Sequence, residues 1–293
     1  MLSVLVVHYH SRGLVEGLAE DLLAQQGQAF EVVLVECGAD GSLERAEAIL
    51  RRNATPVTTV RPGRNLGYCA GNNAAASAAR AGTDLVIVNP DVRMPHHNSL
   101  ARLAAHLEKK TDVAAVAPAI VDDEGVMEYA SSTVNLARGE YLHADHRRRW
   151  SPDEPEEISL PWINGACMAV RRSVWEDVGG FDEQFFLFFD EVDWCMRATQ
   201  AGWRVVLTTE TSVRHQRSAS FGTSTKGAYY YWRNRYLLNR KVQGRGRWTL
   251  HWARDLAKFA IRRRHLRSGA SISALHGATD AMLGRVGPRP GRP

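Results

Sequence analysis

Three carboxylates follow an apolar run in the segment FFLFFDEVDWCMR. The acids are Asp190, Glu191 and Asp193, and four phenylalanines directly precede them. Burial beside apolar surface disfavours a charged carboxylate, so its pKa rises toward the range that suits a general base. A helix beginning near Asp190 would act in the opposite direction, because its N-terminal dipole stabilises an anion. Taken alone, the three acids could also be ordinary residues of a helix start.

Residues that can bind a ligand also follow four apolar runs in the first half of the chain. They are Tyr9 after VLVVHY, Glu36 in VLVECG, Arg64 and Asn65 in VRPGRN, and Asn89 and Asp91 in IVNPD. A carboxylate can accept a hydrogen bond from a base or ribose, an arginine can pair with a phosphate, and an aspartate can hold a divalent cation. Asp, Asn and Gly are also common turn residues, so each position has a purely structural alternative.

The segment GRNLGYCAGNN (63–73) is rich in glycine. Glycines such as Gly71 permit close approach of the backbone to a ligand, whereas the structural alternative is a helix start with an asparagine cap. The segment lacks both the GxGxxG of dinucleotide-binding proteins and the GK[ST] of phosphate-binding loops. It therefore does not indicate either of those two nucleotide sites.

The hydrophobic pattern of residues 1–121 predicts the scaffold that brings these strand ends together. The expected strands are 3–9, 31–36, 57–62, 84–91 and 114–121, and the expected helices are 14–25, 42–51, 67–82 and 98–109. Strands that alternate with helices predict an α/β fold with a mostly parallel sheet. Ligands of such sheets bind at the carboxyl ends of the strands.

The alternation stops after residue 121. The expected elements are a polar loop at 139–157, a strand at 163–172, a short helix in SVWEDVGG, a helix at 190–202 ended by Gly202, and a strand at 204–209. From about residue 226 the chain is expected to be helical and basic. The acids of the opening segment therefore lie at the start of a predicted helix.

Charge and cysteine content limit the classes of protein. The net charge is +5, yet residues 214–293 hold 18 Lys or Arg and only two acids, so a basic tail follows an acidic body. The tail is expected to meet an anionic surface. The four scattered cysteines form no CxxC pair and favour reduced thiols in a cytosol. We expect no membrane span, since no apolar window is long enough, and no signal peptide.

An amphipathic helix is expected within the tail, at 248–266. Its apolar stripe consists of Trp248, Trp252, Leu256 and Phe259, and its basic residues off the stripe are Arg254, Lys258, Arg262 and Arg263. Such a helix can lie in an anionic membrane interface, or it can pack its stripe on the rest of the protein. No nucleic-acid-binding module is recognisable, so we expect no nucleic-acid partner.

Taken together, these motifs carry a resemblance to a known family. The ordered series VVHYHS, VECGADGS, RNLGYCAGNN, IVNPD, INGACMAV, FFLFFDEVDW and SVRHQRSAS resembles family 2 of the inverting glycosyltransferases, which have the GT-A fold. The resemblance covers roughly residues 1–220, as a nucleotide-binding half (1–121) and an acceptor and catalytic half (122–220). Residues 221–293 then form a basic helical extension. FDEVDW and YYYWRNRYLLNRK are most similar to bacterial rhamnosyltransferases.

The resemblance implies roles for the residues at the strand ends. Tyr9 and Glu36 correspond to positions that bind the nucleobase and ribose, although the family usually has Asp at the second. Sugar-nucleotide contacts are expected from Arg64, Asn65, Gly71 and Asn89. Asn89-Pro90-Asp91 replaces the family's Asp-x-Asp, so Asp91 is expected to hold Mg²⁺ or Mn²⁺ on the diphosphate, with His215 completing the metal site.

The resemblance also implies roles in the second half of the chain. Glu191 corresponds to the second acid of the family's pair, which is the general base. Asp193 is expected to orient the acceptor or a neighbouring arginine. Asp190, the first acid of the pair, is grouped with the catalytic acids but is the one most expected to be only a helix-start residue. Asn164 and Gly165 are expected to floor the sugar pocket near the acceptor. Trp162 is expected to stack on a sugar face, with a core tryptophan as the alternative.

The sequence therefore predicts a metal-dependent inverting glycosyltransferase. It would move a sugar, with L-rhamnose as one candidate, from a dTDP- or UDP-sugar to a hydroxyl of a cell-surface glycan or polyprenyl-linked precursor. The expected location is the cytoplasm, with peripheral contact at the inner face of the plasma membrane through the tail. Two alternatives are a catalytically silent nucleotide-binding protein tethered to a membrane and a sugar nucleotidyltransferase, although HYHSRGLVEG offers little of the phosphate loop that the latter needs.

Overall fold

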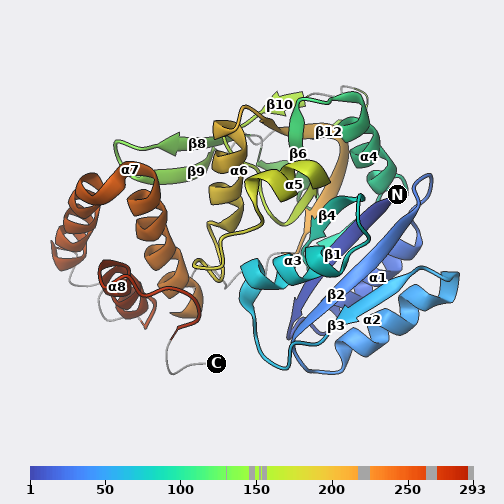
Figure 1. Cartoon of the computed structure of the whole chain (residues 1–293), viewed down its shortest axis with the longest axis horizontal. Coiled ribbons are helices and arrows are strands. Elements are labelled where there is room, and N and C mark those ends of the chain that lie inside the picture. Colours follow the sequence, from blue (N-terminus) through green and yellow to red (C-terminus); the bar gives the residue numbers. More distant parts are fainter. Residues whose placement is uncertain are drawn as a thin grey trace.

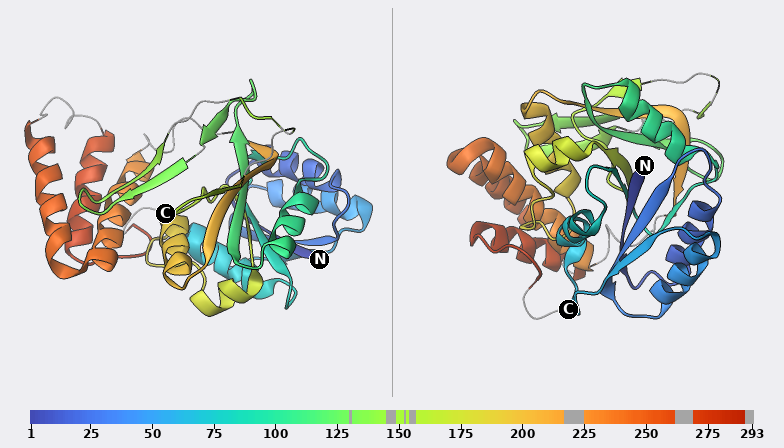
Figure 2. Two further views of the ribbon diagram at one scale, coloured as in Figure 1. Left: turned by 90° about the horizontal axis from the view of Figure 1, so that it is seen from above. Right: turned by 45° about the vertical axis from the view of Figure 1, so that its right-hand side comes forward.

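The computed structural model describes residues 1–129, 131–144, 149–151, 153, 157–216, 225–261 and 269–289. A central twisted sheet carries helices on both faces, and two C-terminal helices stand at one end of it (Figure 1). The left view of Figure 2 shows these helices at the end of the molecule opposite the N-terminus. This arrangement confirms the predicted α/β class with a helical C-terminal part.

The first half forms four parallel strands in the order β3-β2-β1-β4. The strands are β1 (Leu2–Tyr9), β2 (Phe30–Gly38), β3 (Val57–Val60) and β4 (Asp84–Val88). The connecting helices are α1 (Leu14–Leu23), α2 (Ser42–Leu50), the short η1 (Arg51–Asn53) and α3 (Gly67–Ala78). The predicted alternation is confirmed, but α3 ends before Gly82 because Ala79 already has an extended backbone. All four strands therefore direct their carboxyl ends to one edge.

The faces of the sheet are buried by different helices. Because side chains alternate along a strand, Leu5 and Val7 of β1 join the apolar cluster that contains Cys69 of α3. Val4 and Val6 point the other way, into the cluster shared with α1, α2 and the later helix α4 (Ser99–Lys109). Continuous apolar runs such as that of β1 are typical of strands buried on both faces.

The second half continues the same sheet in the order β4-β11-β6-β12-β10. The further strands are β5 (Val92–Arg93), β6 (Val113–Val121), β7 (Met127–Tyr129), β10 (Glu157–Ser159), β11 (Cys167–Val170) and β12 (Arg204–His215), and the helices are α4 (Ser99–Lys109), α5 (Arg172–Val178) and α6 (Asp190–Gln200). Strand β11 runs antiparallel between β4 and β6. Its amino end therefore meets the carboxyl end of β4, and the backbone N–H of Asn89 donates to the carbonyl of Ala166.

Part of the predicted loop at 139–157 is instead a strand. A hairpin forms from β8 (Ser131–Asn135) and β9 (Glu140–Ala144), which pair antiparallel. The polarity of these residues concealed the strands, because a two-stranded hairpin at the surface buries little of either face. Residues 145–148, 152 and 154–156 of the predicted loop lie outside the described residues.

The C-terminal part consists of α7 (Thr225–Ile261) and α8 (Gly269–Met282). Gly244 interrupts α7 with a left-handed φ of 73°, which bends the helix back so that it packs along α8. The expected stripe packs inward here: Trp248 is buried and the indole N–H of Trp252 donates to Ala278 of α8 at 3.0 Å. The side chain of Phe259, together with Arg262 and Arg263, lies outside the described residues.

Two further expectations concern cysteines and membrane spans. All four cysteines are buried free thiols, as their scattered positions predict. Within the described ranges, no helix has the length and hydrophobicity needed to cross a membrane.

Candidate active site

The ends of β1 and β2 present an aromatic ring and a carboxylate. Tyr9 is 39% exposed, and its ring contacts that of His10 with centroids 4.5 Å apart. The carboxylate of Glu36 lies 3.4 Å from the guanidinium of Arg61 at the end of β3. The structure thus brings two predicted ligand-binding residues to one edge and adds Arg61, which the sequence analysis did not select.

The turn before α3 behaves partly as its structural alternative predicts. The side-chain oxygen of Asn65 accepts a hydrogen bond from the backbone N–H of Gly67 at 2.8 Å, while Arg64 is exposed to solvent. A Cβ on Gly71 would lie 2.8 Å from Val7, so this glycine lets α3 pack closely on β1. Arg64 is free to reach a ligand, and the predicted ligand contact of Gly71 stays a prediction.

The end of β4 faces the end of β12 across a carboxylate–histidine pair. Asp91 Oδ1 lies 3.2 Å from His215 Nε2, and the two strand ends are joined by the Gln216 N–H, which donates to the Asp91 carbonyl. The side-chain oxygen of Asn89 and Nδ1 of His215 are buried without a hydrogen-bond partner. Unpartnered buried polar atoms are costly, which is the expected signature of a site completed by a ligand or ion.

These residues fit a divalent cation held jointly with a diphosphate. No cluster of three or more His, Cys, Asp or Glu among the described residues is arranged to hold a metal by itself. Mg²⁺ in phosphate-transfer sites is commonly held by one or two carboxylates together with substrate phosphates. Asp91 and His215 would supply the protein's share of such a site.

Asp190, the first acid of α6, is buried and Glu191, the second, is half-buried, and no ion pair joins either to a cation among the described residues. Burial, followed by the charge of Glu191, raises the pKa of Asp190 well above its usual value. Burial also raises the pKa of Glu191 to about 7, although backbone N–H groups at the helix start partly oppose the shift. The opposition between burial and helix dipole is therefore resolved in favour of burial, which suits a group that accepts a proton near neutral pH.

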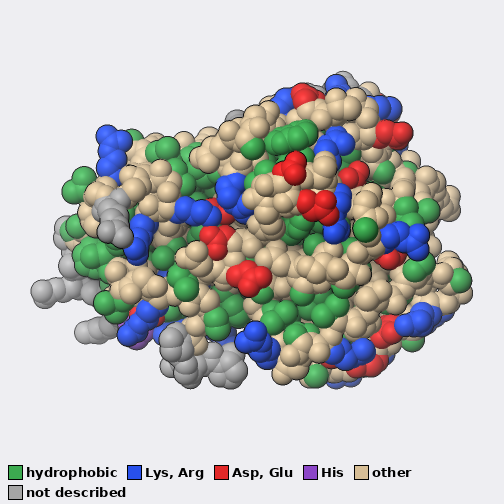
Figure 3. All heavy atoms as spheres, in the orientation of Figure 1, with side chains coloured by type: hydrophobic (Ala, Val, Ile, Leu, Met, Phe, Trp, Pro, Cys, Tyr) green, Lys and Arg blue, Asp and Glu red, His purple; other side chains and the backbone are tan. Residues whose placement is uncertain are grey.

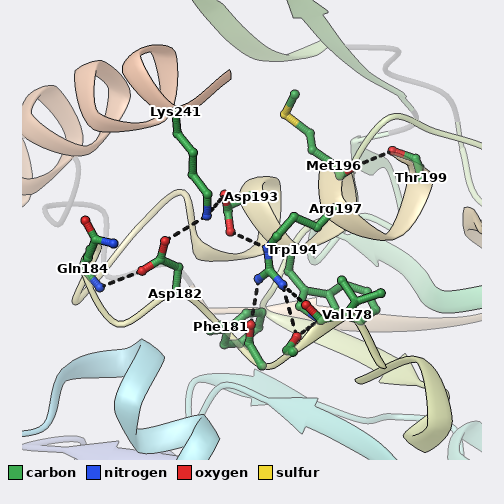
Figure 4. A network of polar contacts seen from close by, with 12 residues as sticks. Val178, Phe181, Asp182, Gln184, Asp193, Trp194, Met196, Arg197, Thr199 and Lys241 are labelled. Carbon is green, nitrogen blue, oxygen red and sulfur yellow. Dashed lines mark hydrogen bonds and ion pairs between the residues drawn. The ribbon is translucent and has the colours of Figure 1, made fainter. Parts of the chain in front are cut away.

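Asp193, two residues further along α6, has the opposite environment. It is 2% exposed and is paired with two cations: Arg197 Nε lies 2.8 Å from Oδ2, and Lys241 Nζ lies 2.7 Å from Oδ1 (Figure 4). Arg197 also donates to the carbonyls of Val178, Gly179 and Gly180, and Lys241 also pairs with Asp182. Asp193 thus orients a neighbouring arginine and ties α6 to α7, rather than standing free in the site.

The phenylalanine loop that precedes α6 has an unusual backbone. Phe186, Phe188 and Phe189 have φ angles of 64°, 68° and 68°, in the left-handed region that bulky residues avoid. Such residues cost about 1–3 kcal/mol each and persist where the surrounding structure over-determines them. On the side of α3, the carbonyl of Phe186 accepts a hydrogen bond from the Tyr68 N–H at 2.7 Å.

The segment before β11 lies next to the acids, as the sequence predicts for a pocket floor. A Cβ on Gly165 would lie 3.3 Å from Cβ of Glu191, so the glutamate side chain passes directly over this glycine. The Gly165 carbonyl accepts a hydrogen bond from the Tyr68 hydroxyl at 2.7 Å, and Asn164 Oδ1 accepts one from the Ala166 N–H. This segment connects Glu191 with Asn89.

Trp162 corresponds to its structural alternative. Trp162 is only 4% exposed, and its indole N–H donates to the carbonyl of Thr133. The centroid of its ring lies 4.2 Å from that of His143. The ring packs as a core side chain, as the structural alternative predicts. The expected stacking of Trp162 on a sugar face stays a prediction.

Sequence reasoning missed four groups that shape the acid site: Tyr68, Arg197, Lys241 and the consecutive pair Arg233 and Asn234. Arg197 could have been found, because it stands four residues after Asp193 on one helix. Lys241 and Asn234 come from a helix about 50 residues away, and no local pattern in the sequence links them to the acids.

The fold and the arrangement of acids at the strand ends define a GT-A glycosyltransferase. The sequence profile described as Glycosyltransferase like family 2 matches residues 2–228, so the chain belongs to that family. It is accordingly a glycosyltransferase that uses a nucleotide sugar.

Individual relatives share less than a third of their residues with this chain. The chain is 28% identical over 244 residues to the N-acetylglucosaminyl-diphospho-decaprenol L-rhamnosyltransferase of Mycobacterium tuberculosis, covering 76% of this chain and 78% of the relative. The mannosyltransferase PcManGT of Pyrobaculum calidifontis, solved with GDP-Man and Mn²⁺, is 14% identical with a TM-score of 0.60 over 97% of this chain and 87% of that one. GalNAc-T7, solved with UDP, GalNAc and Mn²⁺, is 18% identical with a TM-score of 0.61, and the match spans 80% of this chain but only 47% of that one.

Proposed function

We propose that this enzyme transfers a sugar with inversion, using Glu191 as general base and a divalent cation at Asp91. The observation that carries the proposal is the position of Glu191: it is half-buried, its pKa is raised to about 7, and it lies over Gly165 next to the strand end that holds Asn89. A base there would face the reacting carbon of a donor whose diphosphate sits at Asp91.

The reaction then needs one displacement. The carboxylate of Glu191 takes the proton of the acceptor hydroxyl as its oxygen attacks the anomeric carbon, while the bond from that carbon to the nucleoside diphosphate breaks on the opposite face. When bound, Mg²⁺ or Mn²⁺ would neutralise charge that develops on the leaving diphosphate. No covalent link between enzyme and sugar is required.

The donor would lie along the strand ends. Tyr9 offers an exposed ring on which a base can stack, and the Glu36 carboxylate, oriented by Arg61, can accept hydrogen bonds from the ribose. Arg64 is exposed and able to pair with a phosphate. Asn65 and Asn89 stand at the ends of the same edge, and the unpartnered oxygen of Asn89 favours a contact with the donor or its cation.

The donor and acceptor are proposed from the named relative. An enzyme whose name gives L-rhamnose as the sugar and N-acetylglucosaminyl-diphospho-decaprenol as the acceptor supports dTDP-L-rhamnose as donor and a polyprenyl-linked glycan as acceptor. UDP-sugars are the alternative donors. A lipid-linked acceptor requires that the enzyme reach a membrane surface.

The C-terminal helices are proposed to make that contact, as a peripheral extension following a catalytic domain of residues 1–220. The exposed apolar residues Ile272, Met282, Leu283 and Val286 belong to α8 and the turn after it, beside Arg285. In the view of Figure 3, side chains over α7 and α8 are mostly hydrophobic or basic. An anionic membrane on the inner face of the plasma membrane would match both properties.

The experiment that tests the function is direct turnover. Purified protein is given dTDP-L-rhamnose, UDP-GlcNAc or GDP-mannose with a polyprenyl diphosphate-linked GlcNAc acceptor, in Mn²⁺ or in EDTA. We expect transfer from dTDP-L-rhamnose that EDTA abolishes and that inverts the anomeric centre. Nucleotide binding without turnover of any donor would instead identify a silent binding protein, and release of diphosphate from a sugar phosphate and a nucleoside triphosphate would identify a nucleotidyltransferase.

A further inference from the structure

The phenylalanine loop, residues 184–189, is held from one side by two consecutive residues of α7. Asn234 donates its side-chain amide to three loop carbonyls: Phe185 at 2.8 Å, Leu187 at 2.6 Å and Phe188 at 3.1 Å. Arg233 donates to the carbonyls of Gln184 and Phe185, and also to that of Gly287 after α8. Both α7 side chains are fully buried.

The orientation of the Asn234 amide is fixed by its partners. Carbonyl oxygens only accept hydrogen bonds, so the amide nitrogen has to face the loop. The amide oxygen in turn accepts a hydrogen bond from Arg233 Nε at 2.9 Å. Arg233 makes no ion pair among the described residues, and its guanidinium lies over the rings of Tyr229 and Tyr230. Its other hydrogen bonds go to backbone carbonyls of the loop and to that of Gly287.

The carbonyls that Asn234 binds lie among the strained residues: two belong to the residues directly before Phe186 and Phe188, and the third belongs to Phe188 itself. Phe186 and Phe188 have left-handed φ angles, and Phe189, also left-handed, is the residue directly before the first turn of α6. Turning the backbone at these positions is what directs successive carbonyls toward one donor. The buried amide thus compensates a conformation that phenylalanine does not otherwise adopt.

The loop has a second anchor on the nucleotide side. The Tyr68 N–H at the start of α3 donates to the Phe186 carbonyl, and the Phe186 ring occupies the space where a Cβ on Gly67 would lie. The same ring stacks on Tyr230 of α7, with centroids 5.1 Å apart. The loop is therefore clamped between the C-terminal helix and the glycine-rich segment, and α6 begins where the clamp ends.

We propose that Asn234, supported by Arg233, is a positioning residue for the reaction: by binding three loop carbonyls it fixes where α6 starts and hence where Glu191 meets the acceptor. The proposal rests on the proposed role of Glu191. The C-terminal helix α7 then contributes to catalysis through the loop, without contacting the substrate.

The test compares Asn234→Ser, Asn234→Ala and Asn234→Asp in the full-length protein. Serine keeps one short donor, alanine keeps none, and aspartate places a carboxylate against three carbonyl oxygens. We expect kcat to fall in that order, by about tenfold for alanine and about 10²-fold for aspartate, because small misplacements of a catalytic group are costly. The donor KM and the Kd for free dTDP or UDP should change by less than about threefold, since the strand ends are untouched.

The pH profile separates positioning from general loss of structure. A loosened loop admits water to Glu191, so the acid limb of the kcat profile should move to lower pH in Asn234→Ala. Tyr236→Phe is the matched control: it removes a buried hydrogen bond from the same helix to Asp255 but does not touch the loop carbonyls. Its acid limb should stay at the wild-type pH, whatever its Tm.

Two outcomes would overturn the proposal. One is wild-type kcat in Asn234→Asp; the other is a kcat in Asn234→Ala or Asn234→Ser that falls only with the unfolded fraction while the acid limb stays in place. Each variant is assayed below its own Tm, and the serine and alanine variants carry the test if aspartate prevents folding. Glu191→Gln is assayed in parallel. Full activity of Glu191→Gln refutes the proposed general base. Loss of activity in Glu191→Gln together with wild-type kcat in the Asn234 variants refutes only the positioning role.

Discussion

Two carboxylate sites at the same edge of the sheet have opposite surroundings. Asp91 follows a strand, its side chain is 20% exposed, and His215 lies 3.2 Å away. Asp190 and Glu191 begin a helix against buried phenylalanines, and neither forms an ion pair with any described residue. One site offers an accessible carboxylate for a cation, whereas the other keeps its carboxylates in a setting that favours proton uptake.

The residues at the strand ends and the acids at the start of α6 are therefore held in place in different ways. At the strand ends, Tyr9, Arg64 and Asp91 have few contacts with one another, so a bound donor would have to organise them. At the helix start, α3 and α7 hold the loop that places Glu191 before any ligand arrives. Preorganised groups are effective where charge and protons move, because no reorganisation is then needed during the reaction.

The largest expected effect comes from removing the base. Glu191→Gln keeps the size and hydrogen-bonding capacity of the side chain but cannot take a proton, so kcat should fall by about 10³-fold. Titration calorimetry with dTDP or UDP should give a nearly unchanged Kd. Glu176→Gln, at an exposed acid on α5, is the control and should retain full activity. Normal turnover by Glu191→Gln would remove the contrast between the two carboxylate sites.

The next effect tests the strand-end site. Asp91→Asn removes the charge that faces His215, and we expect donor kcat/KM at limiting Mn²⁺ to fall on the order of 10²-fold, with partial recovery at high Mn²⁺. The measurement is a Mn²⁺ titration of activity at fixed donor. Asp123→Asn, at an acid that is 96% exposed, serves as control. An unchanged Mn²⁺ dependence in Asp91→Asn would show that the cation is held elsewhere.

The sequence predicted the strand-end site better than the acid site. Each strand end is a local pattern, an apolar run followed by polar residues, and parallel pairing necessarily brings such ends together. The acids at 190–193 were also found, because three carboxylates after four phenylalanines conflict with simple hydrophobic patterning. Their separation into two roles was only partly accessible, since it depends on which acids meet cations in the fold.

What could not be predicted depends on contacts between distant segments. Lys241 reaches Asp193 from a helix nearly 50 residues later, and Asn234 reaches the phenylalanine loop in the same way. Strand β9 was predicted as loop, and its partner β8 was not predicted, because the faces of this hairpin are not clearly apolar and polar. Trp162 showed the reverse problem: a tryptophan beside a pocket can serve either the core or a ligand, and only the fold shows how far it is buried.

The third prediction concerns pH. With the pKa of Glu191 raised to about 7, kcat at pH 6 should be about tenfold below that at pH 8, because only the ionised form accepts a proton. Between pH 4.5, the ordinary pKa of glutamate, and about pH 7, Glu191 also binds more protons in the folded state than in the unfolded chain. This group's contribution to the unfolding free energy therefore falls as pH rises through that window.

Two measurements check the pH prediction. The kcat profile from pH 5 to 9 should show an acid limb near 7, on the order of the pKa that burial gives. The Tm of Glu191→Gln should decline less with rising pH than that of the wild type across the same window. An acid limb near the ordinary glutamate pKa would mean that Glu191 is hydrated in the working enzyme.

The smallest expected effect tests Asp193, the acid of α6 that is paired with cations, unlike Asp190 and Glu191. Lys241→Met keeps the aliphatic length of the side chain but removes the cation shared by Asp182 and Asp193, leaving Arg197 as the partner of the latter. We expect the unfolding free energy to fall by about 1–2 kcal/mol, the Tm to fall by several degrees and kcat to fall by only about threefold. These values follow from our proposal that Asp193 holds α6 in place and takes no part in the chemistry. Calorimetric unfolding and steady-state kinetics give both values.

Lys258→Met is the matched control, because that lysine is 60% exposed and its ion pair among the described residues is with Asp255 on its own helix. A fall in kcat as large as that of Glu191→Gln, with little change in Tm, would instead place Asp193 among the reacting groups and merge the three acids into one catalytic unit.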